Sequence, residues 1–241
     1  MLWLPFGQHA FLLVHWMKVG TFMAPFLLLV AFSLRAETAP SSDPRTLALF
    51  LLVAYIAHQF EEHWIDLFGR VFAFKPYLNN FLSGVTGQSS GTEIVSDAAV
   101  FVINTSLVWL VAALAIWRGA ARIFATLCMA AIVVVNAISH IAAGVVSSGY
   151  NPGLLTAVLV FLPVGGFVYA TLLRTGRASV RLVLLSLLWG VLAHVIMIGG
   201  FLLLNRFDQL PELAYFAILV LWSIIPAVTL GGATVGTQSV T

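Results

Sequence analysis

The chain has 241 residues, of which 61% are hydrophobic and only 8% are charged. A soluble domain usually carries about 25% charged residues, because its surface must be solvated. The composition therefore excludes a soluble enzyme, a disordered chain and a collagen-like fibre. The net charge of +2 comes without a basic cluster, so we expect no nucleic-acid partner. A polytopic membrane protein is the class that remains.

Seven apolar runs are long enough to cross a bilayer as helices, which takes about 20 residues each. The strands of a barrel would instead alternate over about ten residues. We therefore predict an all-α, polytopic transmembrane helix bundle of about seven helices, or six if the first run does not span. The runs cover residues 11–34, 46–67, 98–117, 123–147, 153–173, 182–204 and 212–231. We interpret the whole chain, 1–241, as a single transmembrane helical domain.

The connection between the second and third runs, residues 68–97, is much longer than the others. Thirty residues without structure would be unusual in a compact protein. The first half of the connection mixes aromatic with basic side chains, and the second half is rich in Gly, Ser and Thr. The aromatic and basic residues are Arg70, Phe72, Phe74, Lys75, Tyr77 and Phe81. We expect an interfacial helix followed by a loop or lid.

Lysine and arginine residues are distributed unevenly between the two sets of loops. One set contains Arg35, Arg45, Arg118, Arg122, Arg174, Arg177 and Arg181, and the other contains Arg70, Lys75 and Arg206. The side richer in these residues stays in the cytoplasm, so we expect the N-terminus outside and the C-terminus inside. No basic residue precedes Lys18, and we expect the N-terminal segment to be retained. The expected location is a bacterial inner membrane or another cytoplasmic-type membrane.

The second run carries the densest group of ionisable residues, HQFEEH at positions 58–63. Residues i, i+3 and i+4 share one face of a helix. We therefore expect His58, Glu61 and Glu62 to point the same way and His63 to face elsewhere. Two adjacent carboxylates in a low dielectric need a proton or a cation nearby. Since no Lys or Arg is expected at that depth, a metal ion or a shared proton is favoured.

Polar residues on three further runs are expected at a similar depth. A rise of about 1.5 Å per residue places them with His58 and Glu62 in one slab of the outer half of the membrane. They are Asn104, Asn136, His140 and His194. An ionisable side chain inside a bilayer costs from about 2.5 kcal/mol upward, so the slab predicts a functional site. Asn104 and His194, taken singly, are equally compatible with hydrogen bonds between helices.

Three motifs follow one another along the chain. They are His58-x-x-Glu61-Glu62, Asn136-x3-His140-x3-Gly144 and Tyr150-Asn151-Pro152-Gly153-Leu154-Leu155-Thr156. Together they resemble the HXXEE-domain family of integral membrane proteins, with an HXXEE-like core at about residues 46–160. The resemblance also implies a distant likeness to the androgen-induced and androgen-dependent membrane hydrolases, which act on lipid esters with a threonine nucleophile. We assign no threonine of this chain to that role.

The leading hypothesis is a metal-dependent intramembrane enzyme that acts on a lipid-like substrate near the outer leaflet, as a hydrolase of an ester or amide. The predicted ligands of a divalent metal, zinc or iron, are His58, Glu61, Glu62, His140 and His194. Catalytic roles are assigned to Glu61, Glu62 and Asn136, and substrate binding to Asn104, Tyr150 and Thr156. The expected partners are membrane lipids and a hydrophobic small molecule. With iron, oxidation of an alkyl chain would be the natural chemistry.

Two other functions remain open. Without a metal, His58, Glu61 and Glu62 would shuttle protons to isomerise or cyclise a sterol- or terpene-like substrate. Alternatively, the carboxylates would relay protons or cations in a transporter. The inner halves of the predicted helices contain no continuing acidic or basic path, and paired broken helices are not visible. Both features disfavour transport.

Overall fold

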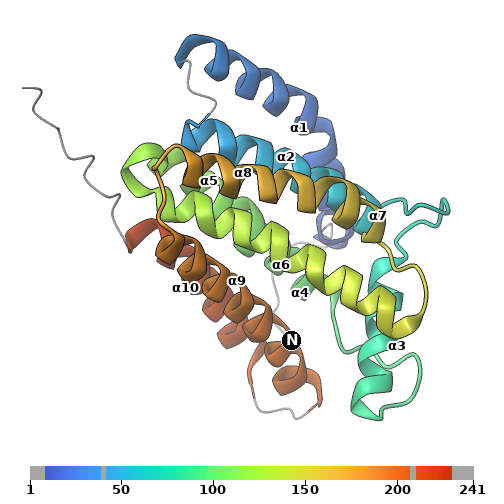
Figure 1. The fold of residues 1–241 in the computed structure, drawn as a ribbon. Helices are drawn as coiled ribbons and strands as arrows, with labels where there is room; N and C mark the ends of the chain where they lie inside the picture. Colours follow the sequence, from blue (N-terminus) through green and yellow to red (C-terminus); the bar gives the residue numbers. More distant parts are fainter. Residues whose placement is uncertain (1–8, 39–41, 207–209, 230–241) are drawn as a thin grey trace, which may run out of the picture.

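The structure is a computed structural model that describes residues 9–38, 42–206 and 210–229. This described part consists of helices and their connections, and it contains no β-strand beyond one isolated bridge between Ile65 and Val71. The long helices lie roughly side by side in a bundle (Figure 1). The predicted all-α bundle is confirmed.

Each of the seven predicted apolar runs forms one helix or a succession of helical segments. The first two runs form α1 (His9–Thr38) and α2 (Pro44–His63). The third forms α4 (Asp97–Ile103), the π-helix η1 (Asn104–Leu110) and α5 (Val111–Arg118). A 3-10 turn, η2 (Gly119–Arg122), leads to α6 (Ile123–Ser147). The remaining segments are α7 (Leu154–Thr156), the π-helix η3 (Ala157–Phe161), α8 (Leu162–Arg174), α9 (Val180–Phe201), the π-helix η4 (Leu202–Arg206) and α10 (Glu212–Val228).

Five helical stretches are long and apolar enough to cross a membrane, judged by length and composition. They are Phe11–Leu34, Asp97–Arg118, Ile123–Ser147, Leu154–Arg174 and Val180–Leu204. The helix α10 is also apolar but has only 17 residues. The helix α2 has 20 residues, carries most of its ionisable residues in the last two turns and is largely buried by its neighbours. It therefore brings polar groups into an otherwise apolar bundle.

The helix α2 ends at His63, earlier than the predicted run, which extends to residue 67. The chain turns there because the Asp66 carboxylate accepts hydrogen bonds from the backbone N–H groups of Phe68 and Arg70, each at 2.9 Å. Asp66 also pairs with the Arg70 guanidinium at 2.6 Å. Such local bonds from an Asp side chain compete with helix formation, so the last helical turn is replaced by this tight connection.

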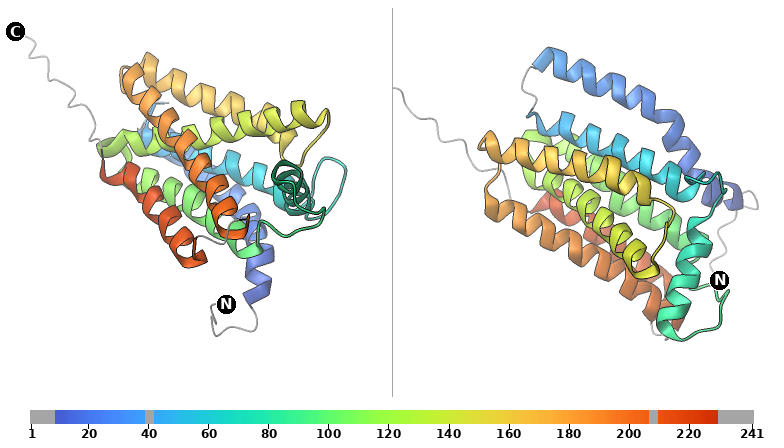
Figure 2. Two further views of the ribbon diagram at one scale, coloured as in Figure 1. Left: turned by 90° about the horizontal axis from the view of Figure 1, so that it is seen from below. Right: turned by 45° about the vertical axis from the view of Figure 1, so that its right-hand side comes forward.

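The long connection contains an amphipathic helix, α3 (Phe74–Thr86), which crosses one end of the bundle close to the end of α6 (Figure 2). A helix in this connection agrees with the prediction for residues 68–97. Lys75 pairs with Glu93 at 2.9 Å and with Asp97 at 2.8 Å, which fastens the start of α3 to the start of α4. The helix thus covers the end of the bundle at which α2 terminates.

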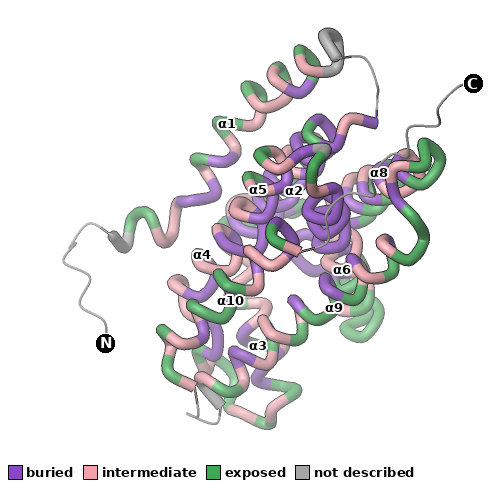
Figure 3. The backbone as a smooth tube through the Cα atoms, turned by 90° about the vertical axis from the view of Figure 1, so that its left-hand side faces the viewer, coloured by how far each residue is buried: buried purple, intermediate pink, exposed green. Residues whose placement is uncertain are grey.

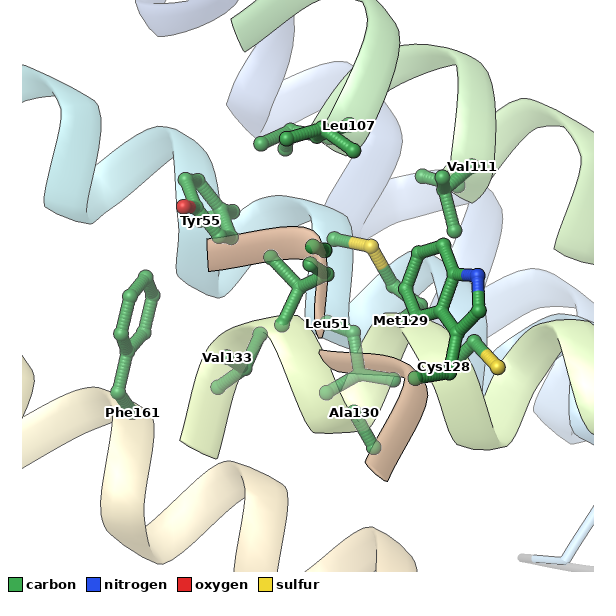
Figure 4. Close-up of a cluster of buried hydrophobic side chains, with 14 of the residues drawn as sticks. Leu51, Tyr55, Leu107, Val111, Cys128, Met129, Ala130, Val133 and Phe161 are labelled. Atoms are coloured by element: carbon green, nitrogen blue, oxygen red, sulfur yellow. The ribbon is translucent and has the colours of Figure 1, made fainter. Parts of the chain in front are cut away.

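The helix α1 packs along α2 from one side, and much of its surface is exposed (Figure 3). By contrast, α6 lies at the centre and contacts α2, α5, α8 and α9. Small residues permit these close approaches: a Cβ atom at Gly190 would lie 2.9 Å from Cβ of Ala131, and one at Gly165 would lie 2.5 Å from Cγ2 of Val134. Membrane helices commonly pack through small residues. The resulting apolar core includes Cys128 (Figure 4).

Candidate functional site

The candidate site lies where the last two turns of α2 meet α6. His58 and Glu62 are one turn apart on α2, and His140 of α6 reaches the same place. One ligand atom from each of the three residues lies within 4.8 Å of the others. All three residues are buried. Within the part of the chain that the structure describes, no other group of three His, Cys, Asp or Glu residues converges in this way.

The Glu62 carboxylate contacts three imidazole rings. Its Oε1 atom lies 3.3 Å from Nε2 of His140. Its Oε2 atom lies 3.0 Å from Nε2 of His63 and 3.5 Å from Nε2 of His58. A buried carboxylate in such a position is compensated by a proton on one of the rings or by a cation between them.

Nδ1 of His58 and Nδ1 of His140 each have a hydrogen-bond partner, and these partners determine which ring nitrogen carries the proton. Nδ1 of His58 lies 2.8 Å from the hydroxyl oxygen of Thr156, and that hydroxyl donates its proton to the Glu61 carboxylate. The hydroxyl oxygen therefore accepts from His58, so the proton of the neutral ring is on Nδ1. In the same way, Nδ1 of His140 donates to Oδ1 of Asn151 at 2.6 Å.

The Nε2 lone pairs of His58 and His140 consequently both face Glu62. Asn151 donates from Nδ2 to the backbone oxygen of His140 at 2.9 Å. This bond orients the amide so that Oδ1 faces the His140 ring. A hydrogen-bond acceptor at one ring nitrogen is the usual support of a histidine that binds metal through the other. The lone pair of His58 also has the Asn136 amide nitrogen 3.4 Å away. A carboxylate repels both lone pairs, so the arrangement favours a cation.

Glu61 points away from this group, to the start of α7. Its carboxylate accepts hydrogen bonds from the backbone N–H groups of Leu155, at 3.1 Å, and Thr156, at 2.7 Å. It also accepts from the Thr156 hydroxyl and, at 2.9 Å, from the Tyr150 hydroxyl. Backbone N–H groups at a helix N-terminus lack partners and attract negative charge. Glu61 therefore fastens α2 to α7 and, through Thr156, supports the ring of His58.

Gly153 allows the backbone to pass close to both histidine rings. Its φ angle is +96°, a conformation that residues with a side chain rarely adopt. A Cβ atom at this position would lie 2.7 Å from Cε1 of His58 and 2.8 Å from Cε1 of His140. The two rings can keep their places only because position 153 has no side chain.

Asn136 and His194 lie beside the group of three. Asn136 donates from Nδ2 to the Tyr55 hydroxyl at 2.8 Å, and the same nitrogen lies 3.4 Å from Nε2 of His58. His194 donates from Nδ1 to the backbone oxygen of Gly190 at 2.9 Å, which leaves its Nε2 lone pair available. His194 is nevertheless outside the group of three, as is Glu61.

Asn104 belongs to a second polar network on the other side of Glu62. It accepts a hydrogen bond from the Gln59 amide at 2.9 Å, and its Nδ2 atom lies 3.3 Å from Nε2 of His63. The Gln59 amide oxygen accepts from the Trp109 indole at 3.1 Å. Asn104 is the first residue of the π-helix η1, and π-helical turns often occur at functional sites.

A cavity of about 390 Å³ opens beside Glu62. Five of the predicted site residues line it: Glu62, Asn104, Asn136, His140 and His194. The remaining lining is mostly apolar and comes mainly from α3, α4 and the last turns of α6 and α9. Tyr150 and Thr156, which were predicted to bind substrate, are not among the described residues that line this cavity. Both instead donate to Glu61.

The expectation that His63 faces away from the cluster is wrong. Its Nε2 atom contacts Glu62, and its ring packs edge-on against Trp16 and Phe74. Helical spacing places the backbone of His63 on a different face from His58. However, the Glu62 side chain is long, and its carboxylate spans the two faces with contacts to imidazoles on both sides.

Sequence reasoning did not select Tyr55 or Asn151. Tyr55 precedes His58 by three residues, so helical spacing places both on one face of α2 and could have indicated Tyr55. Asn151 was part of the third motif, but nothing in the sequence indicated that its side chain would return to His140, 11 residues earlier.

The turn after α2 is held by charged and hydroxyl groups. Burial would raise the pKa of Asp66, but the hydrogen bonds from Arg70 and Phe68 outweigh burial and hold this pKa below its usual value. Burial and the hydrogen bond to Glu61 raise the pKa of Tyr150. The Tyr150 hydroxyl therefore stays protonated near neutral pH and remains a donor to Glu61.

Comparison with known proteins gives a family match. The family described as "Protein of unknown function with HXXEE motif" matches residues 49–169, half of the chain. The matched segment extends from α2 to α8 and contains all three residues of the converging group. No curated protein and no solved structure matches the chain. The chain belongs to the family of proteins with an HXXEE motif, which in this sequence is the stretch from His58 to Glu62.

Proposed function

We propose that the chain is a metal-dependent enzyme that acts within the membrane and hydrolyses an ester or amide bond of a lipid-like substrate. The observation that carries this proposal is the convergence of His58, His140 and Glu62, with acceptors behind both histidines. Two histidines and one carboxylate are the protein ligands of many catalytic zinc sites, which keep a further position open. The cavity beside Glu62 would give an apolar molecule access to that position.

Zinc and iron both suit this set of nitrogen and oxygen ligands. When bound, such a cation polarises a carbonyl oxygen and lowers the pKa of a water molecule. We propose Glu61 as a positioning residue and not as a ligand, because four hydrogen-bond donors already occupy its carboxylate. His194 lines the cavity with its Nε2 atom available and is the proposed site of a further ligand or substrate contact.

Hydrolysis breaks the bond between the acyl carbon and the oxygen or nitrogen of the leaving group. The hydroxyl group of water goes to the acyl carbon, and its proton goes to the alcohol or amine. We assign the transfer of this proton to His63, since its ring contacts Glu62 and lines the cavity and histidine is the side chain that most often acts as a general acid or base. Asn136 also lines the cavity, and its amide is suited to binding the carbonyl oxygen.

One observation favours a second candidate, a metal-free isomerase or cyclase of sterol- or terpene-like substrates. The three imidazoles around Glu62 form a set in which a proton can pass between bases without a metal. A transporter has less support. Among the described residues, the buried polar side chains in the other half of the bundle are hydroxyl groups such as Thr126, Ser186 and Ser223, with no Asp, Glu, His, Lys or Arg.

We further propose that the site faces the outer leaflet of a cytoplasmic-type membrane, such as a bacterial inner membrane. Arg118, Arg122 and Arg174 are the last residues of α5, η2 and α8. These helix ends lie at the end of the bundle opposite α3 (Figure 1). Connections rich in arginine remain in the cytoplasm. The N-terminus would then be outside and the C-terminus inside, and the lipid-like substrate would enter sideways from the outer leaflet.

Metal analysis of the purified protein tests the proposal. Protein purified without chelator is expected to contain about one divalent ion per chain. His58→Ala and His140→Ala should each lower the metal content strongly, because each removes a ligand. His15→Ala is the matched control, since His15 lies on α1 and outside the group of three. If the wild-type protein holds no metal and gains no thermal stability from zinc, iron or manganese, the metal mechanism is wrong and the metal-free isomerase becomes the leading function.

A further inference from the structure

Two cavities meet at His63. The larger, of about 390 Å³, is the cavity beside Glu62, and the smaller, of about 220 Å³, lies between α1 and the start of α3. His63, Phe74 and Val100 line both of them. The Phe74 ring packs edge-on against His63, with 5.0 Å between the ring centroids, and lies 6.1 Å from the ring of His140. The imidazole ring of His63, which contacts Glu62, therefore lies between the two cavities.

The two cavities offer different chemistry. Beyond its polar residues, the larger cavity is lined by apolar side chains such as Phe81, Ala143 and Phe201, and no Lys or Arg lines it within the described ranges. The smaller cavity has Lys75 and Asp97 in its lining, paired with each other at 2.8 Å. A charged group placed among the apolar residues of the larger cavity, away from Glu62, would lose its hydration without meeting a Lys or Arg. The larger cavity thus suits a hydrocarbon chain, and the smaller one suits a polar group.

We propose that the substrate of the hydrolysis put forward above is a lipid with a single acyl chain and a small polar alcohol or amine, held across His63. The acyl chain occupies the larger cavity, the alcohol or amine occupies the smaller one, and the scissile carbonyl group lies between them beside Glu62. This inference rests on the proposed function for the reaction, but the placement of the two halves follows from the cavities alone.

The size of the larger cavity supports a single chain. Small-molecule sites usually enclose about 300–1,000 Å³, and 390 Å³ is near the lower limit. A phospholipid with two acyl chains would exceed this volume, and no Lys or Arg among the described residues lines the cavity to pair with its phosphate. After cleavage, the acyl product would remain on the membrane side, and the polar alcohol or amine would leave through the smaller cavity past Lys75.

In the proposed complex, Phe74 separates the acyl chain in the larger cavity from the alcohol or amine in the smaller one. Its ring covers His63 on the side of α3 and contributes to the lining of both cavities. We assign it the role of a specificity-determining residue that keeps the acyl chain out of the smaller cavity. Its removal should join the two spaces without removing any group that contacts Glu62.

Photoaffinity labelling in nanodiscs tests this placement without turnover. Two non-hydrolysable ketone analogues of dodecanoyl ethanolamide carry a diazirine, one at the end of the chain and the other in the polar part. The chain-end probe is expected to label the outer turns of α6 and α9, including Val146 and Ile198, which line the larger cavity. The polar-part probe is expected to label Phe72 and Pro76, which line the smaller one.

Three variants sharpen the result. Ala143→Phe fills part of the larger cavity and should lower chain-end labelling severalfold, whereas Val145→Phe should not, because Val145 is exposed on the same helix and does not line the cavity. Ala143→Leu makes the same test with a smaller side chain if the Phe variant unfolds. Phe74→Ala should allow the chain-end probe to label Phe72 as well.

The labelling experiment overturns the inference if both probes label the same residues, if labelling spreads equally to lipid-facing positions such as Val145, or if a two-chain phosphatidylcholine competes as well as the single-chain probes. The experiment is repeated after treatment with EDTA. Separate labelling of the two cavities in a protein that binds no metal would retain the two-cavity placement and reject the metal-dependent hydrolase. A metal-containing protein without separate labelling would reject the placement and leave the proposed function standing.

Discussion

Nδ1 of His58 lies 2.8 Å from the hydroxyl oxygen of Thr156, 98 residues further along the chain. The hydroxyl donates a hydrogen bond to Glu61, whose carboxylate also accepts from the backbone N–H groups of Leu155 and Thr156 at the start of α7. A helix terminus is thereby linked through two side chains to one imidazole ring. This link orients His58 so that its Nε2 lone pair faces Glu62.

Thr156→Val should weaken metal binding while preserving the shape of the side chain. Removing the acceptor behind a metal-binding histidine typically lowers metal affinity about 10–100-fold. Competition with a fluorescent zinc indicator measures the change. Thr105→Val is the control, because the Thr105 hydroxyl bonds to backbone oxygens of its own helix, at 2.8 Å to Phe101. An unchanged zinc affinity in Thr156→Val would show that the hydroxyl does not support His58.

Glu61→Gln and Glu62→Gln should affect different properties of the protein. A glutamine at position 61 has one acceptor oxygen in place of two, so at least one donor at the start of α7 is left without a partner. An unsatisfied buried donor costs about 1–3 kcal/mol, so the free energy of unfolding in detergent should fall by about that amount. Glu62→Gln should instead lower metal content with a smaller loss of stability. Equal behaviour of the two variants in both measurements would contradict this division of roles.

Gly153→Ala should both destabilise the fold and abolish the proposed metal binding. The added Cβ atom meets His58 and His140, so the rings must move apart, in addition to the strain of a positive φ angle. Gly176→Ala is the matched control, because Gly176 also has a positive φ angle, +66°, but nothing lies within 4 Å of the Cβ position. The control should lose about 1 kcal/mol from backbone strain and keep its metal. Metal content measured in both variants separates ring displacement from strain.

Asp66 should make the stability of the fold depend on acidic pH. The pKa of Asp66 is lower in the folded protein than its usual value, which is about 3.9 in an unfolded chain. Its contribution is therefore fully present above about pH 4 and is lost as the pH falls through the folded pKa. Thermal unfolding should show Asp66→Asn less stable than wild type at pH 7, with a difference that shrinks below about pH 4. A constant difference across this range would argue against the ion pair with Arg70.

The two ends of the bundle should face opposite sides of the membrane. In a Cys128→Ser background, Ser89→Cys in the loop after α3 should react with an impermeant thiol reagent in intact cells. Thr175→Cys, in the loop between α8 and α9, should react only after permeabilisation. That loop lies at the arginine-rich end of the bundle, which is expected to face the cytoplasm. Both positions are exposed in the structure. The reverse pattern of labelling would invert the proposed orientation.

The sequence by itself determined the class of fold and much of the site. Apolar runs of about 20 residues have few alternatives to helices in a membrane, and each of the seven predicted runs is mostly helical where the structure describes it. Spacing along α2 placed His58 and Glu62 on one face, and comparison of depths brought Asn104, Asn136, His140 and His194 to one level. The structure arranges Glu62 with these four around a single cavity.

Only the tertiary structure decided that Glu62, and not Glu61, contacts the imidazole rings. It also decided that His140, and not His194, joins His58 and Glu62 in the converging group. Helical periodicity fixes the direction of a side chain relative to its own helix, but not how a neighbouring helix or loop meets it. The left-handed conformation of Gly153 brings the start of α7 back beside α2. Glu61 therefore bonds to the backbone of α7, and Glu62 contacts the imidazole rings. The contact between Glu62 and His63 likewise depends on the conformation of a long side chain, which the spacing of residues along the sequence does not encode.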